Sequence, residues 1–378
     1  MQIETMYFNE EKWHYENESI QNKSDVDLVL IFGATDVLEK NIHYTFFAKQ
    51  YKNAQIIGSS SAGNVLGAKV SDKDVVATAI SLDKGYIKTS VIDFIQEDDF
   101  NIVSQNLVAN LPDEKLKSIF IISDGLSMNG TVLAHNVNKI KANTLITGGL
   151  AGDDARFEKT LVIANDHAKN NRMVAIGFYG DDLHVSSGCY SGWDEFGAER
   201  IITKSVGNVV YEIDNEPALE LYKKYLGDEA KNLPGSGLRF PLSIKQNEKD
   251  GNYLIRTLLA VDETENSMTF AGDVYEGYIA KLMKTNIDGL IDGSELAAKD
   301  IHKANENTAL GLVVSCIGRK LVMRDLTDEE LEIIEDTVGS NVKLTGFYSY
   351  GELAPFSDKI KSCELHNQTM TLTVIYED

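Results

Sequence analysis

Three short glycine-bounded loops carry the side chains of this sequence that could bind or transform a ligand. The loops are residues 58–63, 148–152 and 346–351, and the first holds three serines in a row at 59–61. A serine hydroxyl acts as a nucleophile only beside a general base, and no histidine lies near these serines in the sequence. Hydrogen bonding to a ligand or to the backbone is therefore favoured, with plain turn chemistry as the alternative.

The first and third loops have the Gly-x4-Gly spacing of a phosphate-binding loop. That motif requires Lys and then Ser or Thr after the second glycine, where this chain has Asn64-Val65 and Glu352-Leu353. No Gly-x-Gly-x-x-Gly follows a predicted strand and opens a helix, and the Gly-x-Ser-x-Gly nucleophile elbow is absent from the sequence. Phosphate-loop and dinucleotide-binding functions are therefore excluded.

Single polar residues near predicted strand ends are further candidates. Gly152 precedes Asp153, whose carboxylate suits a ligand amine or a cation, or a solvated turn. Arg319 could clamp a carboxylate or lie on the surface. Cys316 ends an apolar run, where a cysteine is either a small buried hydrophobe or, if exposed near a cation, a reactive thiol. His366 is a hydrogen-bonded turn residue, a ligand contact or an axial ligand of haem iron.

Composition and charge narrow the class of partner. The chain of 378 residues has 36 Lys and Arg against 58 Asp and Glu, for a formal net charge of −22. Polyanions are bound through clustered cations, so nucleic acid and anionic membrane surfaces are not expected as partners. No secretory leader and no membrane-spanning apolar stretch are found, which predicts a cytoplasmic protein. The 3 scattered cysteines and 7 histidines lack the spacing of a disulfide framework or a protein-only metal site.

The elements that must position these residues are alternating strands and helices. β-branched apolar runs predict strands, and apolar residues at three- and four-residue intervals predict helices. A short polar turn at 83–85 between the apolar runs 75–80 and 87–92 predicts that these two strands pair antiparallel as a hairpin. We expect an α/β fold in the mixed α+β sense, with mixed β-sheets forming a central sandwich flanked by helices, in two related halves. The predicted strands are 28–32, 55–57, 75–80, 118–122, 144–146, 173–178, 253–260, 310–316, 342–344 and 370–375, and the predicted helices are 41–51, 131–142, 217–226 and 327–338.

An internal repeat connects the loops to these elements. Three times an apolar strand runs into a glycine turn, a helix-length segment follows, and a short strand ends in a second glycine. Strand followed by glycine turn is common in α/β proteins, which is the alternative explanation. We interpret the pattern as a repeated strand–helix–strand–loop unit with its loops at strand ends. The glycine pairs are Gly33 and Gly58, Gly125 and Gly148, and Gly318 and Gly346.

A long motif near the C-terminus consists of residues 346–355, GFYSYGELAP, and residues 365–372, LHNQTMTL. This motif resembles the closing signature of FIST domains, a sensory module of bacterial signalling proteins. In the first loop the family usually has Cys and Glu where this chain has Ser59 and Asn64, so a thiol or carboxylate role is not expected at these two positions. Other segments that fit the family are 57–63 and 148–153 in the N-terminal half and 217–222, 271–277 and 315–319 in the C-terminal half.

The resemblance implies a stand-alone sensor with a FIST N-like ligand-binding domain at 24–213 and a FIST C-like domain at 214–378. It implies a small-molecule ligand, amino acids among them, no cofactor, no enzymatic activity, and a separate histidine kinase or cyclase as signalling partner. One branch of the family consists of haem proteins that sense nitric oxide, so haem held by His366 is the alternative. An enzyme acting through the loop serines or Cys316 is a third hypothesis, and the oligomeric state stays open.

The leading hypothesis places a small polar or zwitterionic ligand in a crevice where the glycine loops converge. Backbone donors of residues 58–63 and Arg319 would bind its carboxylate, Asp153 or Glu352 its amine, and Tyr348 with Tyr350 would close the pocket. The candidate ligand-binding residues are Gly33, Thr35, Gly58, Ser59, Ser60, Ser61, Gly63, Asp124, Gly148, Gly149, Asp153, Cys316, Arg319, Tyr348, Tyr350, Glu352, His366 and Asn367.

Overall fold

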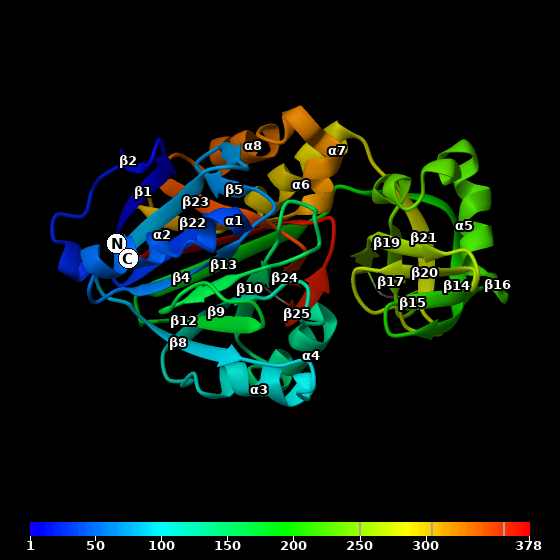
Figure 1. Ribbon diagram of the computed structural model, residues 1–378, viewed down its shortest axis with the longest axis horizontal. Coiled ribbons are helices and arrows are strands. Elements are labelled where there is room, and N and C mark those ends of the chain that lie inside the picture. Colours follow the sequence, from blue (N-terminus) through cyan, green and yellow to red (C-terminus); the bar gives the residue numbers. More distant parts are fainter. Residues whose placement is uncertain (249–250, 304, 358–359) are drawn as a thin grey trace.

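The computed structural model describes residues 1–248, 251–303, 305–357 and 360–378. Its fold is mixed α+β, as predicted, and contains three six-stranded sheets and one curled eight-stranded sheet. The three six-stranded sheets form one body, and residues 194–284 form a smaller unit beside it, at the right of Figure 1. No helix in the described part of the chain is long and apolar enough to cross a membrane.

Each sheet of the body has six strands, which follow one another in space in an order different from that of the sequence. The first sheet is β11 (Val162–Ala164), β4 (Gln55–Ser60), β3 (Leu28–Gly33), β7 (Val75–Ser81), β1 (Gln2–Asn9) and β2 (Lys12–Asn17). The second is β25 (Ile360–His366), β24 (Gly351–Ser357), β10 (Leu145–Leu150), β9 (Leu116–Ser123), β12 (Arg172–Tyr179) and β8 (Tyr86–Asp93). The third is β13 (Leu183–Tyr190), β26 (Met370–Glu377), β22 (Ala309–Cys316), β23 (Val342–Ser349), β5 (Asn64–Leu66) and β6 (Lys69–Ser71).

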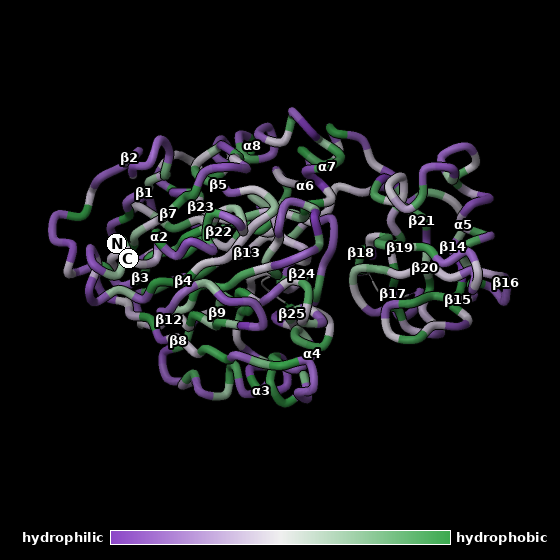
Figure 2. The backbone as a smooth tube through the Cα atoms, viewed as in Figure 1, coloured by the Kyte–Doolittle hydropathy of each residue, from purple (hydrophilic) through white to green (hydrophobic). Residues whose placement is uncertain are grey.

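The three sheets share an inner core, and helices cover their outer faces. Alternate residues of β3 divide between the two sides: Leu28, Leu30 and Phe32 belong to the inner core and Val29 and Ile31 to the outer one. Figure 2 shows these apolar strands in green inside the body. The helices are α1 (Thr35–Leu38) and α2 (Ile42–Gln50) on the first sheet, α3 (Phe100–Ala109) and α4 (Gly130–Ile140) on the second, and α6 (Ile287–Lys299), α7 (Ile317–Met323) and α8 (Glu329–Val338) on the third, with short 3-10 turns at Lys23–Asp25 and Arg324–Leu326.

The sheet topology confirms the repeated unit. Each sheet contains a parallel strand pair and an antiparallel third strand beside it: β4-β3-β7, β10-β9-β12 and β23-β22-β26. After each pair the chain crosses to a neighbouring sheet, where β5 pairs with β23, β11 with β4, and β24 with β10. The body is therefore a threefold arrangement of related units whose strands are exchanged between sheets.

The second glycine of each unit lies where the paired strand leaves no room for a side chain. A Cβ atom on Gly58 would be 1.9 Å from the carbonyl oxygen of Ile31. The corresponding distances are 1.9 Å for Gly148 and Ile121 and 1.8 Å for Gly346 and Val313. The same contact in all three units explains why glycine recurs at this point of the sequence repeat.

The smaller unit is a curled sheet around its own apolar core. Its two connections to the body run side by side, because a Cβ atom on Gly192 would be 2.1 Å from the carbonyl oxygen of Gly289. Its elements are β14 (Asp194–Val206), β15 (Val209–Ile213), β16 (Glu216–Pro217), α5 (Ala218–Leu226), β17 (Leu242–Lys245), β18 (Leu254–Arg256), β19 (Leu258–Asp262), β20 (Ser267–Phe270) and β21 (Ile279–Lys284), with 3-10 turns at Gly227–Asn232 and Gly235–Arg239.

The hairpin predicted for 75–80 and 87–92 is wrong, because β7 pairs with β1 and β3 in the first sheet and β8 pairs with β12 in the second. The predicted strand 253–260 is two strands, β18 and β19, separated at Thr257. The division into 24–213 and 214–378 stays a prediction, and the hydrogen-bonded sheets join strands from both sides of it, since β13 pairs with β26 and β10 with β24.

Candidate functional site

The three glycine-bounded loops meet at one end of the body, as the sequence hypothesis requires. Each loop follows the second strand of its unit and then crosses to another sheet, so the threefold topology brings the loops together. Backbone hydrogen bonds join them in pairs: Ala62 N–H donates to Tyr348 O at 2.9 Å, Gly152 N–H to Ser60 O at 3.2 Å and Tyr350 N–H to Leu150 O at 3.0 Å.

The serines of the first loop are buried inside this junction. Ser60 Oγ accepts a hydrogen bond from Leu161 N–H at 2.9 Å, and Ser61 Oγ donates to Asn64 Oδ1 at 2.5 Å. Ser59 Oγ has no hydrogen-bond partner among the described residues. The hydroxyls of Ser60 and Ser61 thus stabilise the loop itself, which agrees with hydrogen bonding within the protein rather than to a ligand.

The guanidinium of Arg319 is fully buried and paired with Glu330. Its Nη2 lies 2.7 Å and its Nε 3.0 Å from the same carboxylate oxygen of Glu330, and Nη1 donates to Ser191 O at 2.6 Å. The other oxygen of Glu330 accepts the hydroxyls of Tyr348, at 2.5 Å, and Ser315, at 2.9 Å. Arg319 and Tyr348 therefore belong to a buried network of protein groups, and their ligand-binding roles stay predictions.

The carboxylate of Asp153 holds the following turn in place. It accepts the N–H groups of Phe157, Glu158 and Lys159 at 2.8 to 2.9 Å, and the hydroxyl of Tyr350. Four donors saturate an ionised carboxylate. Asp153 is consequently occupied and cannot also bind a ligand amine in this conformation.

The remaining loop candidates have contacts that fix the backbone. Thr35 Oγ1 donates to Lys159 O at 3.2 Å. Asp124 accepts the N–H groups of Leu126, Ser127 and Asn171 at 2.7 to 2.9 Å. The glycines leave no room for a side chain, since a Cβ atom would be 2.9 Å from Val75 at Gly33, 3.1 Å from Tyr348 at Gly63 and 2.6 Å from Val314 at Gly149.

Glu352 is a buried carboxyl group at the start of β24. Its Oε1 accepts the hydroxyl of Ser349 at 2.6 Å, and its Oε2 accepts the hydroxyl and N–H of Thr369 at 2.9 and 3.2 Å. Cys316 lies beside this carboxyl, because its N–H donates to Thr369 O at 3.2 Å. Burial raises the pKa of Glu352 to about 7, and burial followed by the charge of Glu352 raises the pKa of the Cys316 thiol.

The Glu352→Gln variant is expected to gain stability relative to the parent as the pH rises. The carboxyl has a pKa of about 7 in the folded chain against 4.5 as its ordinary value, so its contribution is present below pH 4.5 and is lost as the pH rises through 7. Urea unfolding at pH 5 and pH 8 should show a difference between the two proteins that changes by up to about 3 kcal/mol. Glu332→Gln on the exposed face of α8 is the matched control, and an equal change in both variants would contradict the assignment.

His366 is neutral and engaged with the backbone. Its Nε2 lies 3.0 Å from Ala354 O, and burial lowers the pKa of the imidazole to about 4. The neighbouring Asn367 accepts Thr257 N–H at 3.4 Å. The cavity beside His366 has a volume of about 210 Å³, below the roughly 300 Å³ at which drug-sized pockets begin, so the residues present do not fit a haem.

Two cavities lie in the crevice between the body and the smaller unit. One of about 370 Å³ is bordered by residues 125–130 and Gly272, and one of about 140 Å³ by Cys316 and Leu258. The back of the crevice is fixed by Arg256 of the smaller unit, which donates to Leu365 O of the body at 3.0 Å. Both cavities are lined by Phe157, Leu259, Ala271 and Tyr350, which makes them two compartments of one crevice.

Phe157 lines both compartments. It stacks on Tyr350 with centroids 4.5 Å apart and an interplanar angle of 17°, and half of its surface is exposed. Its φ of +54°, with +60° at Asp154 and +59° at Ala155, is a left-handed conformation that bulky residues rarely adopt. Such strain is kept where the surroundings enforce it, often at ligand sites, and here the carboxylate of Asp153 enforces it.

Thr257 lines the smaller cavity and carries a buried hydroxyl without a partner among the described residues. The residue is 5% exposed. A buried hydroxyl without a partner costs free energy that a ligand could recover. The residue lies at the break between β18 and β19, and because the sequence predicted one continuous strand over 253–260, it gave no signal for this position.

The structure thus brings only part of the predicted set to a cavity. Tyr350, Cys316 and Asn367 line the crevice, and His366 lines the separate 210 Å³ cavity. The other predicted residues support the loop junction. The crevice residues that the sequence did not reveal are Phe157, Thr257, Leu258, Leu259 and Ala271, most of them from the smaller unit.

Comparison with known proteins gives a consistent picture at the level of sequence. The family model for the FIST N domain matches residues 27–216, and that for the FIST C domain matches residues 218–355. An uncharacterized protein of Mycobacterium tuberculosis is 24% identical over 249 residues, covering 62% of each chain. An uncharacterized protein of Methanocaldococcus jannaschii is 26% identical over 261 residues, covering 61% of this chain and 48% of its own. The chain thus spans about half to two thirds of these relatives.

Among solved structures the similarity is distant. A cyanuric acid hydrolase from A. caulinodans aligns over 94% of this chain and 91% of its own, with 6% identity and a TM-score of 0.39. A chorismatase aligns over 99% and 98%, with 6% identity and a TM-score of 0.34. Similarity at this level says nothing about activity.

Proposed function

The chain belongs to the FIST family of sensory domains, and from this premise we propose that it is a small-molecule sensor whose ligand binds in the crevice between the body and the smaller unit. The observation that supports this site is the two-compartment cavity at the loop junction, whose compartments are both lined by the strained Phe157. Ligand pockets are concave and mostly apolar, with a few polar groups that orient the ligand. The crevice has this character.

The ligand that suits this crevice is small, largely apolar and uncharged. Leu258, Leu259 and Phe157 supply apolar walls, and Thr257 supplies a hydroxyl that lacks a partner. A zwitterionic amino acid would need a free cation and a free carboxylate. The two side chains assigned to those tasks, Arg319 and Asp153, are saturated by protein groups.

Ligand binding would act on the relative position of the two units. A molecule in the crevice contacts Tyr350 of the body and Leu259 of the smaller unit at once. The connections of the two units run together at Gly192 and Gly289, where a small backbone rotation moves the whole smaller unit. A separate signalling protein, such as a histidine kinase or a cyclase, would read this change.

Thermal unfolding with matched pairs of compounds tests the proposal. Indole and phenol are uncharged, and tryptophan and tyrosine present the same rings on a zwitterion. We expect one of the uncharged compounds to raise the melting temperature, since a ligand at a hundred times its Kd stabilises the folded state by about 2.7 kcal/mol. No shift with any of the four would contradict the crevice as a site for such rings, and a shift with the amino acids alone would overturn the uncharged ligand.

Two matched tryptophan variants test whether the ligand binds in the crevice. Ala271→Trp fills space shared by both compartments and should abolish the shift. Val206→Trp adds the same ring at a position that is 69% exposed and lines neither cavity, so the shift should persist. A shift that survives in Ala271→Trp would show that the compound binds elsewhere.

A further inference from the structure

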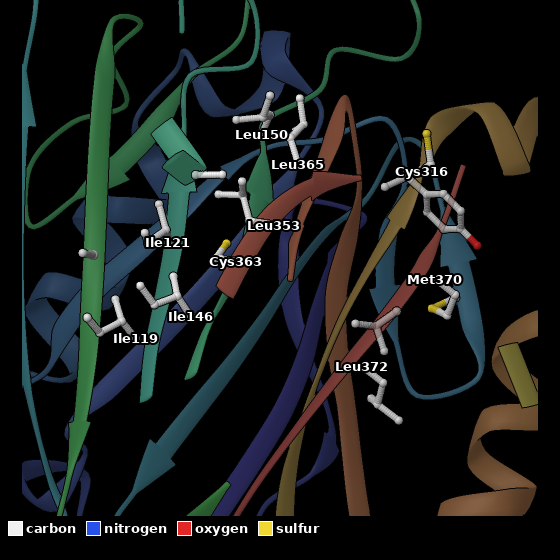
Figure 3. Packing of buried hydrophobic residues seen from close by; sticks show 14 of the residues in the cluster. Ile119, Ile121, Ile146, Leu150, Cys316, Leu353, Cys363, Leu365, Met370 and Leu372 are labelled. Atoms are coloured by element: carbon white, nitrogen blue, oxygen red, sulfur yellow. The ribbon is translucent and has the colours of Figure 1, made fainter. Parts of the chain in front are cut away.

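Cys316 lines the smaller compartment of the crevice. Cys316 is the last residue of β22, and Cys316, Ile317 and Gly318 form one wall of the 140 Å³ cavity where β22 passes into α7. Tyr350 and Leu258 form the facing walls. Figure 3 shows Cys316 at this junction, away from Cys363, which lies beside Leu353. The sulfur of Cys316 is therefore next to the space in which we place the ligand.

Three groups surround this sulfur. Glu352 lies beside Cys316, because Thr369 donates its N–H to the Glu352 carboxyl and accepts the N–H of Cys316, each at 3.2 Å. The charge of Glu352 raises the pKa of the Cys316 thiol, and the N–H groups of Gly318 and Gln368 lower it. Glu352 is held in position by Ser349 and Thr369. A proton acceptor and two donors around one thiol are the components that a nucleophilic cysteine requires.

The resting group is a neutral thiol, because burial raises its pKa. Reaction therefore requires that the proton leaves while the new bond forms, and Glu352 is the carboxyl beside this thiol. The other titratable groups near Glu352 do not compete for it: the pKa of Cys189 is raised by burial, His366 is neutral, and Arg319 is paired with Glu330. The pKa of Glu352, about 7, makes its carboxylate available above neutral pH.

We propose that Cys316 captures a small uncharged α,β-unsaturated carbonyl compound in this cavity by conjugate addition, with Glu352 as proton acceptor; this rests on the proposed ligand site. The sulfur forms a bond to the β-carbon, and the π electrons of the carbon–carbon double bond move toward the carbonyl. The thiol proton passes to Glu352 and then to the α-carbon, so that a thioether forms and nothing leaves.

Thr257 is the second observation that points to a ligand at this thiol. Thr257 lines the same cavity as Cys316, and its buried Oγ1 lacks a partner among the described residues. The carbonyl oxygen of the ligand gains negative charge during the addition, and a hydroxyl donor in an apolar site stabilises such charge. The apolar walls favour an uncharged compound over an ionised one.

N-ethylmaleimide, an uncharged unsaturated imide, tests the proposal on the intact chain. Mass spectrometry of tryptic peptides after timed labelling at pH 8 reports each of the 3 cysteines separately. We expect Cys316 to react at least tenfold faster than Cys363, which is fully buried and lines neither compartment of the crevice. Equal rates at the two sites, or labelling of Cys316 only after unfolding, would overturn the proposal.

The preference for an uncharged compound is tested by changing the charge of the reagent, and the role of Glu352 is tested by changing the pH. Maleimidoacetic acid carries the same reactive ring and one negative charge, and it should label Cys316 at least tenfold more slowly than N-ethylmaleimide. The labelling rate in the parent should rise more steeply between pH 6 and pH 8 than in Glu352→Gln. The Cys189→Ser/Cys363→Ser variant repeats the measurement with Cys316 alone. If the labelling rate depended neither on the charge of the reagent nor on Glu352, the apolar walls would not select the ligand and Glu352 would not be the proton acceptor.

The test separates this inference from the ligand site on which it rests. Indole and phenol form no covalent bond to a thiol, so the temperature shift that they produce in the parent reports the ligand site without the reaction at Cys316. A retained shift without selective labelling in the parent overturns the capture of an electrophile alone. Loss of both the shift and the labelling in the parent overturns the site itself.

Discussion

Replacing Arg319 by methionine is expected to lower the free energy of unfolding by about 3 to 5 kcal/mol, the cost typical of breaking a buried ion pair. Arg319 and Glu330 are both fully buried, and their pair joins β22, α6, α7 and α8 of the third sheet through Ser294, Ser315 and Tyr348. The methionine fills much of the same volume but leaves the carboxylate of Glu330 buried without its cation. Urea unfolding at pH 7 measures the loss.

Two further variants identify the cause of that loss. Arg319→Met/Glu330→Leu removes both charges and should recover much of the stability, because no buried charge then lacks a partner. Lys231→Met breaks the exposed pair of Lys231 and Asp228 and should have no measurable effect. If Arg319→Met behaved like Lys231→Met, the buried pair would contribute nothing, and Arg319 would again be open to a ligand role.

Gly148→Ala is expected to destabilise the body by about 3 to 5 kcal/mol, in the range of the most damaging single substitutions. The added Cβ would be 1.9 Å from Ile121 O and 2.7 Å from Ile121 N, both of them backbone atoms of the paired strand β9. Relief would require the parallel strands β9 and β10 to separate, with loss of their hydrogen bonds. Thermal and urea unfolding measure the change.

The threefold arrangement predicts that the equivalent glycine of each unit responds in the same way to substitution. Gly58→Ala and Gly346→Ala place a Cβ 1.9 and 1.8 Å from equivalent carbonyl oxygens, so they should cost about as much as Gly148→Ala. Gly251→Ala is the matched control, because no atom lies within 4 Å of the added Cβ. An effect at only one of the three positions would contradict the equivalence of the units.

Local sequence patterns predicted the elements well where one residue type has one physical use. The glycines at 58, 148 and 346 predicted the loops, because only glycine fits against a neighbouring strand at that distance. The apolar runs predicted β3, β9 and β22, which are buried on both faces. The run 253–260 was wrong as one strand, since β18 pairs with β17 and β19 with β20, and Thr257 lies between them.

The roles of polar residues could not be read from the sequence in the same way. Arg319 and Glu330 are 11 positions apart, and Tyr350 and Asp153 are 197 apart. A candidate charge is available to a ligand only if no protein group neutralises it, and that depends on which distant segments fold against it. The same holds for Phe157, whose ring is positioned in the crevice by stacking on Tyr350, a residue distant in the sequence.

The sequence by itself therefore determined the fold class, the repeated strand–loop units and the family, because spacing and residue size along the chain dictate these locally. The loops meet because their strands are exchanged between the sheets. The tertiary structure alone decided which side chains line the crevice. The crevice forms between the body and the smaller unit, so its walls come from residues as distant as Phe157, Thr257 and Cys316. Its chemistry follows from which polar groups the fold leaves without a partner, and packing settles that only when the chain is complete.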